Sequence, residues 1–116
     1  MTRILLVDDN VDALETLSTL LGMFEHEVAT AATPQEAIQR VQEFHPDLAI
    51  LDVGLPGMNG YQLGMELRRT VGEGVPLRMI TLSGHGRDAD SERSAAAGFE
   101  RHLVKPVDFD ELLRLI

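Results

Sequence analysis

The sequence contains no cysteine, and only one of its ten basic residues is a lysine, Lys105. Without cysteine, disulfides, zinc–thiolate sites, iron–sulfur clusters and cysteine nucleophiles are excluded. No apolar run reaches the roughly 18 residues of a membrane span, and the N-terminus lacks the basic-then-apolar pattern of a signal peptide. We therefore expect a soluble, cytoplasmic protein.

Positive charge is also scarce. Nineteen acidic residues against ten basic ones give a net charge of −9. Such a surface repels the phosphates of nucleic acids and of anionic lipids, so we expect no direct contact with nucleic acid or with a membrane. A chain of 116 residues has the length of one domain, and we expect residues 1–116 to fold as one unit.

Solid apolar runs alternate with segments of helical periodicity. Continuous apolar runs are typical of strands that are buried on both faces. The pattern predicts strands at 3–7, 27–31, 47–51, 76–82 and 101–104, and helices at about 11–21, 34–44, 61–70, 87–97 and after 108. Gly22 is the predicted stop of the first helix, and Thr33 with Glu36 forms a predicted capping box at the start of the second. Five such β–α units indicate an α/β fold with a parallel sheet covered on both faces.

Polar residues follow the predicted strands. Asp8 and Asp9 come after the first strand, Asp52 after the third, Ser83 after the fourth and Lys105 after the fifth. Ligands of open α/β sheets gather at the carboxyl ends of the strands. We therefore expect three carboxylates, one hydroxyl and one ammonium to converge on a single edge.

This set of groups suits phosphoryl transfer. Three neighbouring carboxylates repel one another unless a cation lies among them, and hard oxygen donors suit Mg²⁺. The ammonium of Lys105 and the hydroxyl of Ser83 can each donate to a phosphate oxygen. Phosphoryl transfer needs little more than positioning and charge neutralisation. Asp52 stands alone on the central strand between the acidic pair and the lysine, so it is the predicted nucleophile.

Four motifs occur in order at these strand ends. They are LLVDDN (5–10), LDVGLPGMNG (51–60), ITLSG (80–84) and LVKP (103–106). With them, essentially the whole chain resembles a receiver domain of two-component response regulators, of the chemotaxis-regulator kind. The resemblance implies a doubly wound, flavodoxin-like sheet of order 2-1-3-4-5. It also implies phosphorelay signalling, with a histidine kinase or a histidine phosphotransfer protein as the partner that donates the phosphoryl group.

The resemblance also assigns a phosphoacceptor and a metal site. Asp52 is the implied phosphoacceptor. The implied cofactor is Mg²⁺, held by Asp9, Asp52 and the backbone carbonyl of Gly54, with Asp8 contributing mainly through water. Such a domain is not an enzyme acting on a separate substrate, but it catalyses its own phosphorylation and dephosphorylation. Gly54 offers no side chain to guide or block an attacking water, so the phosphoryl lifetime is open.

The resemblance assigns a switch as well. Lys105 is expected to pair with the phosphoryl group, and its peptide bond to Pro106 is expected to be cis. Ser83 is the expected switch hydroxyl. Thr81 competes for that role because it lies on the same side of the strand, but the spacing to Lys105 favours Ser83. His102 occupies the position where the family usually has an aromatic switch residue.

Three other function classes compete with this interpretation. A receiver-like interaction module that is not phosphorylated is the main alternative. A phosphatase with a strand-end aspartate generally has a D-x-D motif and a cap domain, whereas Asp8 and Asp9 are adjacent and no cap fits. A flavin-binding protein of similar topology needs glycine, serine and threonine after the first strand, where two aspartates repel a phosphate.

The extent of the parent protein stays open at this point. The last predicted helix reaches Ile116 without a capping residue, which favours a piece of a longer chain. A stand-alone regulator, a receiver from a hybrid sensor histidine kinase and a receiver from a DNA-binding regulator all fit. In the hybrid case the parent chain is itself a histidine kinase.

Overall fold

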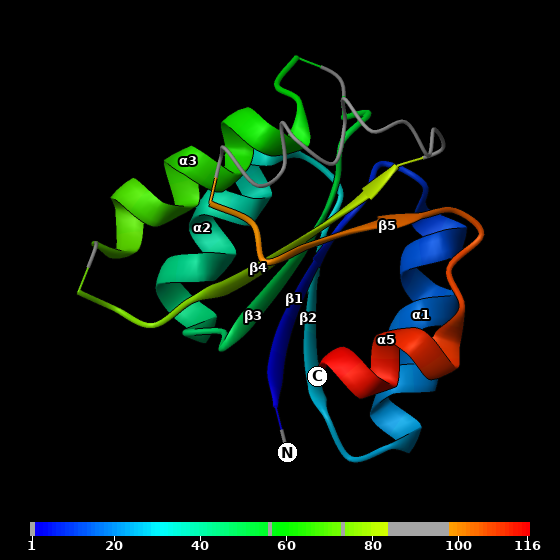
Figure 1. The fold of residues 1–116 in the computed structure, drawn as a ribbon. Coiled ribbons are helices and arrows are strands. Elements are labelled where there is room, and N and C mark those ends of the chain that lie inside the picture. The colour runs from blue at the N-terminus through cyan, green and yellow to red at the C-terminus, as the bar shows by residue number, and fades with distance from the viewer. Residues whose placement is uncertain (1, 56, 73, 84–97) are drawn as a thin grey trace.

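One parallel sheet forms the centre of the computed structural model, which describes residues 2–55, 57–72, 74–83 and 98–116 (Figure 1). Its strand order is β2-β1-β3-β4-β5, as expected for a doubly wound fold. The strands are β1 (Arg3–Val7), β2 (Glu27–Ala31), β3 (Leu48–Asp52), β4 (Arg78–Ser83) and β5 (Arg101–Val104). The helix expected at 87–97 lies outside the described residues.

Helices cover both faces of this sheet. In the described residues these are α1 (Val11–Met23), α2 (Pro34–Phe44), α3 (Gly60–Val71) and α5 (Phe109–Leu115). Figure 1 shows α2 and α3 on one face and α1 and α5 on the other. Successive side chains of a strand point to opposite faces of the sheet, so the strands contribute to two apolar cores. In β1, Leu5 and Val7 face α2 and α3, whereas Ile4 and Leu6 face α1 and α5. None of the described helices is both long and apolar enough to cross a membrane.

Side-chain caps mark where all four described helices begin. At α1, the Asn10 side chain accepts a hydrogen bond from the Ala13 N–H at 3.1 Å. The Thr33 hydroxyl accepts a hydrogen bond from the Glu36 N–H at 3.1 Å, so the Thr33 half of the capping box predicted for α2 is present. The Asp108 carboxylate accepts from two backbone N–H groups at the start of α5. In α3 the Asn59 and Gln62 side chains form a reciprocal capping box, which was not predicted from the sequence.

The predicted stop of α1 at Gly22 is wrong. The helix continues to Met23, and the left-handed residue that closes it is Glu25, with φ 68°. The Glu25 N–H donates to the Gly22 carbonyl at 3.1 Å, and the His26 N–H donates to the Leu21 carbonyl at 3.3 Å. This pair of bonds is a Schellman closure, which satisfies the last carbonyls without a glycine at the left-handed position.

The strand ends differ slightly from the prediction. Strand β3 begins at Leu48 and extends through Asp52, whose backbone pairs with Leu82 of β4. Strand β4 runs from Arg78 to Ser83 instead of from 76 to 82. Asp52 and Ser83 are therefore residues of the sheet ladder itself. The pairing of the strands fixes the backbone of both.

Candidate functional site

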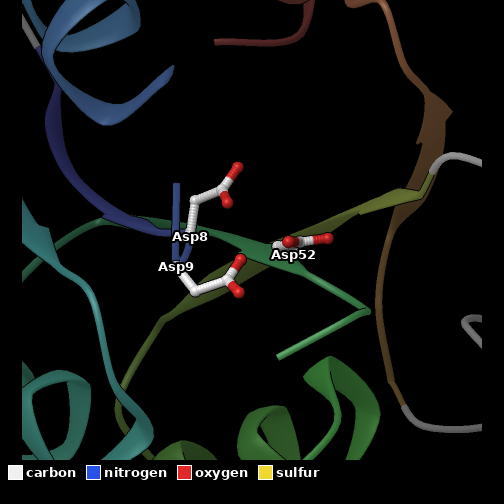
Figure 2. A group of neighbouring side chains, drawn as sticks. All are labelled: Asp8, Asp9 and Asp52. Carbon is white, nitrogen blue, oxygen red and sulfur yellow. The ribbon is translucent and has the colours of Figure 1, made fainter. Parts of the chain in front are cut away.

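Three carboxylates meet at the carboxyl edge of the sheet. Asp8 and Asp9 follow β1, Asp52 ends β3, and one oxygen of each lies within 4.8 Å of the others (Figure 2). Asp8 and Asp52 are buried, whereas Asp9 is exposed. Strands β1 and β3 are neighbours in the sheet, which is why residues 8 and 52 come together.

Backbone N–H groups orient two of these carboxylates. The Gly54 N–H donates to Asp52 Oδ1 at 3.2 Å, and the Asn10 N–H donates to Asp8 Oδ1 at 3.0 Å. Each is a turn in which an aspartate accepts from the backbone two residues further on. One oxygen of each carboxylate is fixed in this way, and the second oxygen is turned toward the neighbouring charged groups.

Lys105 bridges those second oxygens. Its Nζ lies 3.1 Å from Asp8 Oδ2 and 3.4 Å from Asp52 Oδ2. Its backbone N–H donates to the Ser83 carbonyl at 2.7 Å, so the lysine enters the site directly from the β4–β5 edge. The Lys105–Pro106 peptide bond is cis, as expected.

The pKa values of Asp52 and Lys105 reflect the burial of both groups and the charges around them. Burial raises the pKa of Asp52, and the negative charge of Asp8 raises it further, against the opposing effects of the Gly54 N–H and Lys105. Burial alone would lower the pKa of Lys105, but its hydrogen bond to Asp8 and the charge of Asp52 outweigh that effect and raise it. One ammonium therefore compensates only part of the charge of three carboxylates.

The donor set fits Mg²⁺. Mg²⁺ prefers hard oxygen ligands, takes one or two carboxylates directly and retains several waters. Asp8, Asp9 and Asp52 offer three carboxylate oxygens in one cluster, and the exposed Asp9 leaves room for water. The excess negative charge also favours a cation. The Gly54 carbonyl, expected as a further ligand, remains a prediction.

Replacing Asp9 by asparagine is expected to weaken Mg²⁺ binding at least about tenfold, which corresponds to ~1.4 kcal/mol. The substitution removes one negative charge from the exposed member of the carboxylate cluster, so the fold should not change. Titration of backbone NMR signals with Mg²⁺ measures the effect. Asp12→Asn is the matched control. Asp12 is exposed in the first turn of α1, and its substitution changes the net charge by the same amount. Equal Mg²⁺ affinities for the two variants would show that Asp9 does not contribute to Mg²⁺ binding.

The two candidate switch residues lie on adjacent strands. Ser83 is buried at the end of β4 and pairs with Val104. His102 pairs with Thr81, and its Nδ1 lies 2.7 Å from the Thr81 hydroxyl oxygen. Thr81 was predicted only as a competitor of Ser83, and this contact was not predicted from the sequence. Alternation along the strand placed both hydroxyls on one side, but the β4–β5 register decides which one His102 meets.

Gly60 is a positioning residue, a role that was not predicted from the sequence. A Cβ at Gly60 would lie 2.6 Å from the Asp52 carbonyl oxygen and 3.0 Å from the Val53 Cα. The Gly60 N–H also donates to the Val53 carbonyl at 3.2 Å. Only glycine therefore lets α3 begin against the backbone of Asp52.

Comparison with known proteins gives consistent results over nearly the whole chain. Residues 4–116 match the response regulator receiver domain family. The two-component response regulator PhoP of Pseudomonas aeruginosa is 39% identical over 110 residues, which are 95% of this chain and 48% of that protein. This chain spans about half the length of PhoP and of the other first curated relatives.

Solved structures show the same similarity. A CheY-like response regulator receiver domain protein from Methanospirillum hungatei superposes with a TM-score of 0.88 at 30% identity, covering 99% of this chain and 90% of that one. The chemotaxis protein CheY4 of Vibrio cholerae superposes with a TM-score of 0.90 at 28% identity, covering 99% and 95%.

Proposed function

Because the chain belongs to the response regulator receiver domain family, whose function is two-component phosphorelay signalling, we propose that Asp52 is its phosphoacceptor. The donor is a histidine kinase or a histidine phosphotransfer protein, and the reaction takes place in the cytoplasm. The observation that carries the proposal is the setting of Asp52. It is buried at the end of the central strand, beside two further carboxylates and within 3.4 Å of the ammonium of Lys105.

In the proposed reaction a P–N bond of the donor is replaced by a P–O bond to Asp52. A carboxylate oxygen of Asp52 attacks the phosphorus of phosphohistidine, the P–N bond breaks, and an acyl phosphate forms on Asp52. Water later attacks the same phosphorus and releases inorganic phosphate. The Gly54 N–H holds Asp52 in one orientation, and Lys105 pairs with the phosphoryl oxygens. Asp9, Asp52 and the Gly54 carbonyl would hold Mg²⁺ directly and Asp8 would hold it through water, and the bound ion would supply further positive charge against those oxygens.

The output of this reaction is a conformational shift. Ser83 donates its hydroxyl to a phosphoryl oxygen, and His102 responds on the adjacent strand. Phosphorylation thereby stabilises one of two pre-existing arrangements of the β4–β5 edge. NMR signals of β5 and α5 should change between the free form and the form with Mg²⁺ and beryllium fluoride. Unchanged signals there would contradict this part of the proposal.

A side chain at position 54 is expected to control the phosphoryl lifetime. A Cβ at Gly54 would lie 3.8 Å from Asp52 Oδ1, so a bulky apolar side chain overhangs the path of the attacking water. Gly54→Leu should lengthen the lifetime about three- to tenfold, equivalent to ~1 kcal/mol in the barrier. Loss of the phosphoryl group is followed by intact-mass spectrometry after acetyl phosphate is removed. Gly54→Ala is the control, and equal lifetimes for all three proteins would refute the steric argument.

The test of the proposed function uses acetyl phosphate as the donor. Intact-mass spectrometry should show the gain of one phosphoryl group that requires Mg²⁺. Borohydride reduction converts an acyl phosphate to homoserine, and fragmentation should then locate the change at Asp52. No gain in a folded protein would favour the unphosphorylated interaction module. Turnover of a small phosphoester without a stable adduct would favour a phosphatase.

A further inference from the structure

A buried hydroxyl and an imidazole meet across the β4–β5 edge. Thr81 and His102 occupy paired positions, and Thr81 is completely buried. The Thr81 Oγ1 lies 2.7 Å from His102 Nδ1 and 3.5 Å from the Arg101 carbonyl oxygen. The first distance is that of a strong hydrogen bond, and the second is at the outer limit.

The surroundings of the ring select one tautomer. His102 Nε2 is buried and has no hydrogen-bond partner in the part of the chain that the structure describes. A buried N–H without an acceptor costs more than a buried lone pair without a donor. The proton is therefore on Nδ1, which donates to the Thr81 hydroxyl oxygen. The Thr81 O–H then has the Arg101 carbonyl oxygen within reach as an acceptor, at 3.5 Å.

We propose that Thr81 is the positioning residue of His102, fixing both the tautomer and the orientation of its ring. The proposal rests on the proposed function, since it assigns a role within the switch of the same site. Ser83 lies two residues further along β4, on the same side and opposite Val104. The two hydroxyls thus have different roles. Ser83 donates to the phosphoryl group, and Thr81 accepts a hydrogen bond from the imidazole. A displacement of β4 at Ser83 reaches His102 through Thr81.

The imidazole nitrogen signals of His102 test this assignment. Long-range ¹H–¹⁵N spectra distinguish the Nδ1–H tautomer, the Nε2–H tautomer and the doubly protonated ring. The wild type should show the Nδ1–H tautomer. Thr81→Val, which removes the hydroxyl at constant shape, should lose that signature and give the averaged signals of an unanchored ring. Thr81→Ser, which restores the hydroxyl, should recover it, and Ser83→Ala should keep it.

A stability cycle gives a second readout. Thr81→Val and His102→Phe should be non-additive in the unfolding equilibrium constant by about three- to tenfold, the range of one net hydrogen bond. An unchanged tautomer in Thr81→Val, a loss of the tautomer in Ser83→Ala, or an additive cycle would overturn the proposal. Acetyl phosphate labelling of the same wild-type sample reports the proposed function separately. A wild type that does not label refutes that function, and the tautomer spectra still decide the role of Thr81.

Discussion

The Asp52→Asn variant is expected to gain no phosphoryl group from acetyl phosphate, and to be more stable than the wild type when Mg²⁺ is absent. The first effect follows because an amide cannot form the acyl phosphate. The second follows from the raised pKa of Asp52, which burial and the charge of Asp8 cause. A raised pKa in the folded state means that the charged carboxylate destabilises the fold. The fold is therefore more stable while the Asp52 carboxyl is protonated. This extra stability is fully present below the ordinary pKa of about 4, and it is lost as pH rises through the higher pKa of the folded state. At neutral pH the wild type carries this cost, and the amide does not.

Thermal unfolding in EDTA and in Mg²⁺ measures the second effect. In EDTA the variant should have the higher Tm. Mg²⁺ at ten times its Kd should add about 1.4 kcal/mol to the wild type and much less to the variant, so the order of stability should reverse or the gap should close. Asp12→Asn controls for the general relief of net charge, because Asp12 is exposed on α1. A variant less stable than wild type in EDTA would contradict the repulsion argument, and Mg²⁺-dependent labelling of the variant would point to another acceptor.

The sequence alone could predict the meeting of distant groups at the sheet edge. Apolar runs identify the strands, and parallel strands with crossover helices end on the same edge. Asp8 and Lys105 are separated by most of the chain, yet this rule places both beside Asp52. The rule works because it depends only on strand direction and order, and a shift of one residue at a strand end leaves the prediction intact.

Contacts that depend on register or on a single close approach could not be predicted in the same way. Whether Thr81 or Ser83 meets His102 depends on the pairing of β4 with β5, and a shift of two residues preserves every burial pattern while exchanging the partners. Glycine is needed at Gly60 because an added Cβ would lie 2.6 Å from the Asp52 carbonyl oxygen. The local sequence gives no sign of this close approach. At the end of α1 the glycine signal pointed to Gly22, whereas the left-handed residue is not a glycine.

Replacing Lys105 by methionine is expected to slow phosphorylation of Asp52 by about a hundredfold or more, the usual effect of removing one preorganised charge from a transferring group. Its raised pKa keeps Lys105 charged well above neutral pH, so the charge is present wherever the protein is assayed. The rate is measured by intact mass against time at saturating Mg²⁺. Arg101→Met is the matched control, because Arg101 is an exposed cation on β5. Equal losses in both variants would mean that only net charge matters.

The same variant should change stability in the direction opposite to Asp52→Asn. Lys105 is the partner of two buried carboxylates, and without it Asp8 and Asp52 repel each other with less compensation. In EDTA, Lys105→Met should therefore unfold at a lower temperature than the wild type. Adding Asp8→Asn should recover stability, because it removes one of the two repelling charges, but it should not restore the phosphorylation rate. Recovery of both would show that Lys105 serves only to hold the carboxylates in place, and recovery of stability alone would separate its structural role from its action on the phosphoryl group.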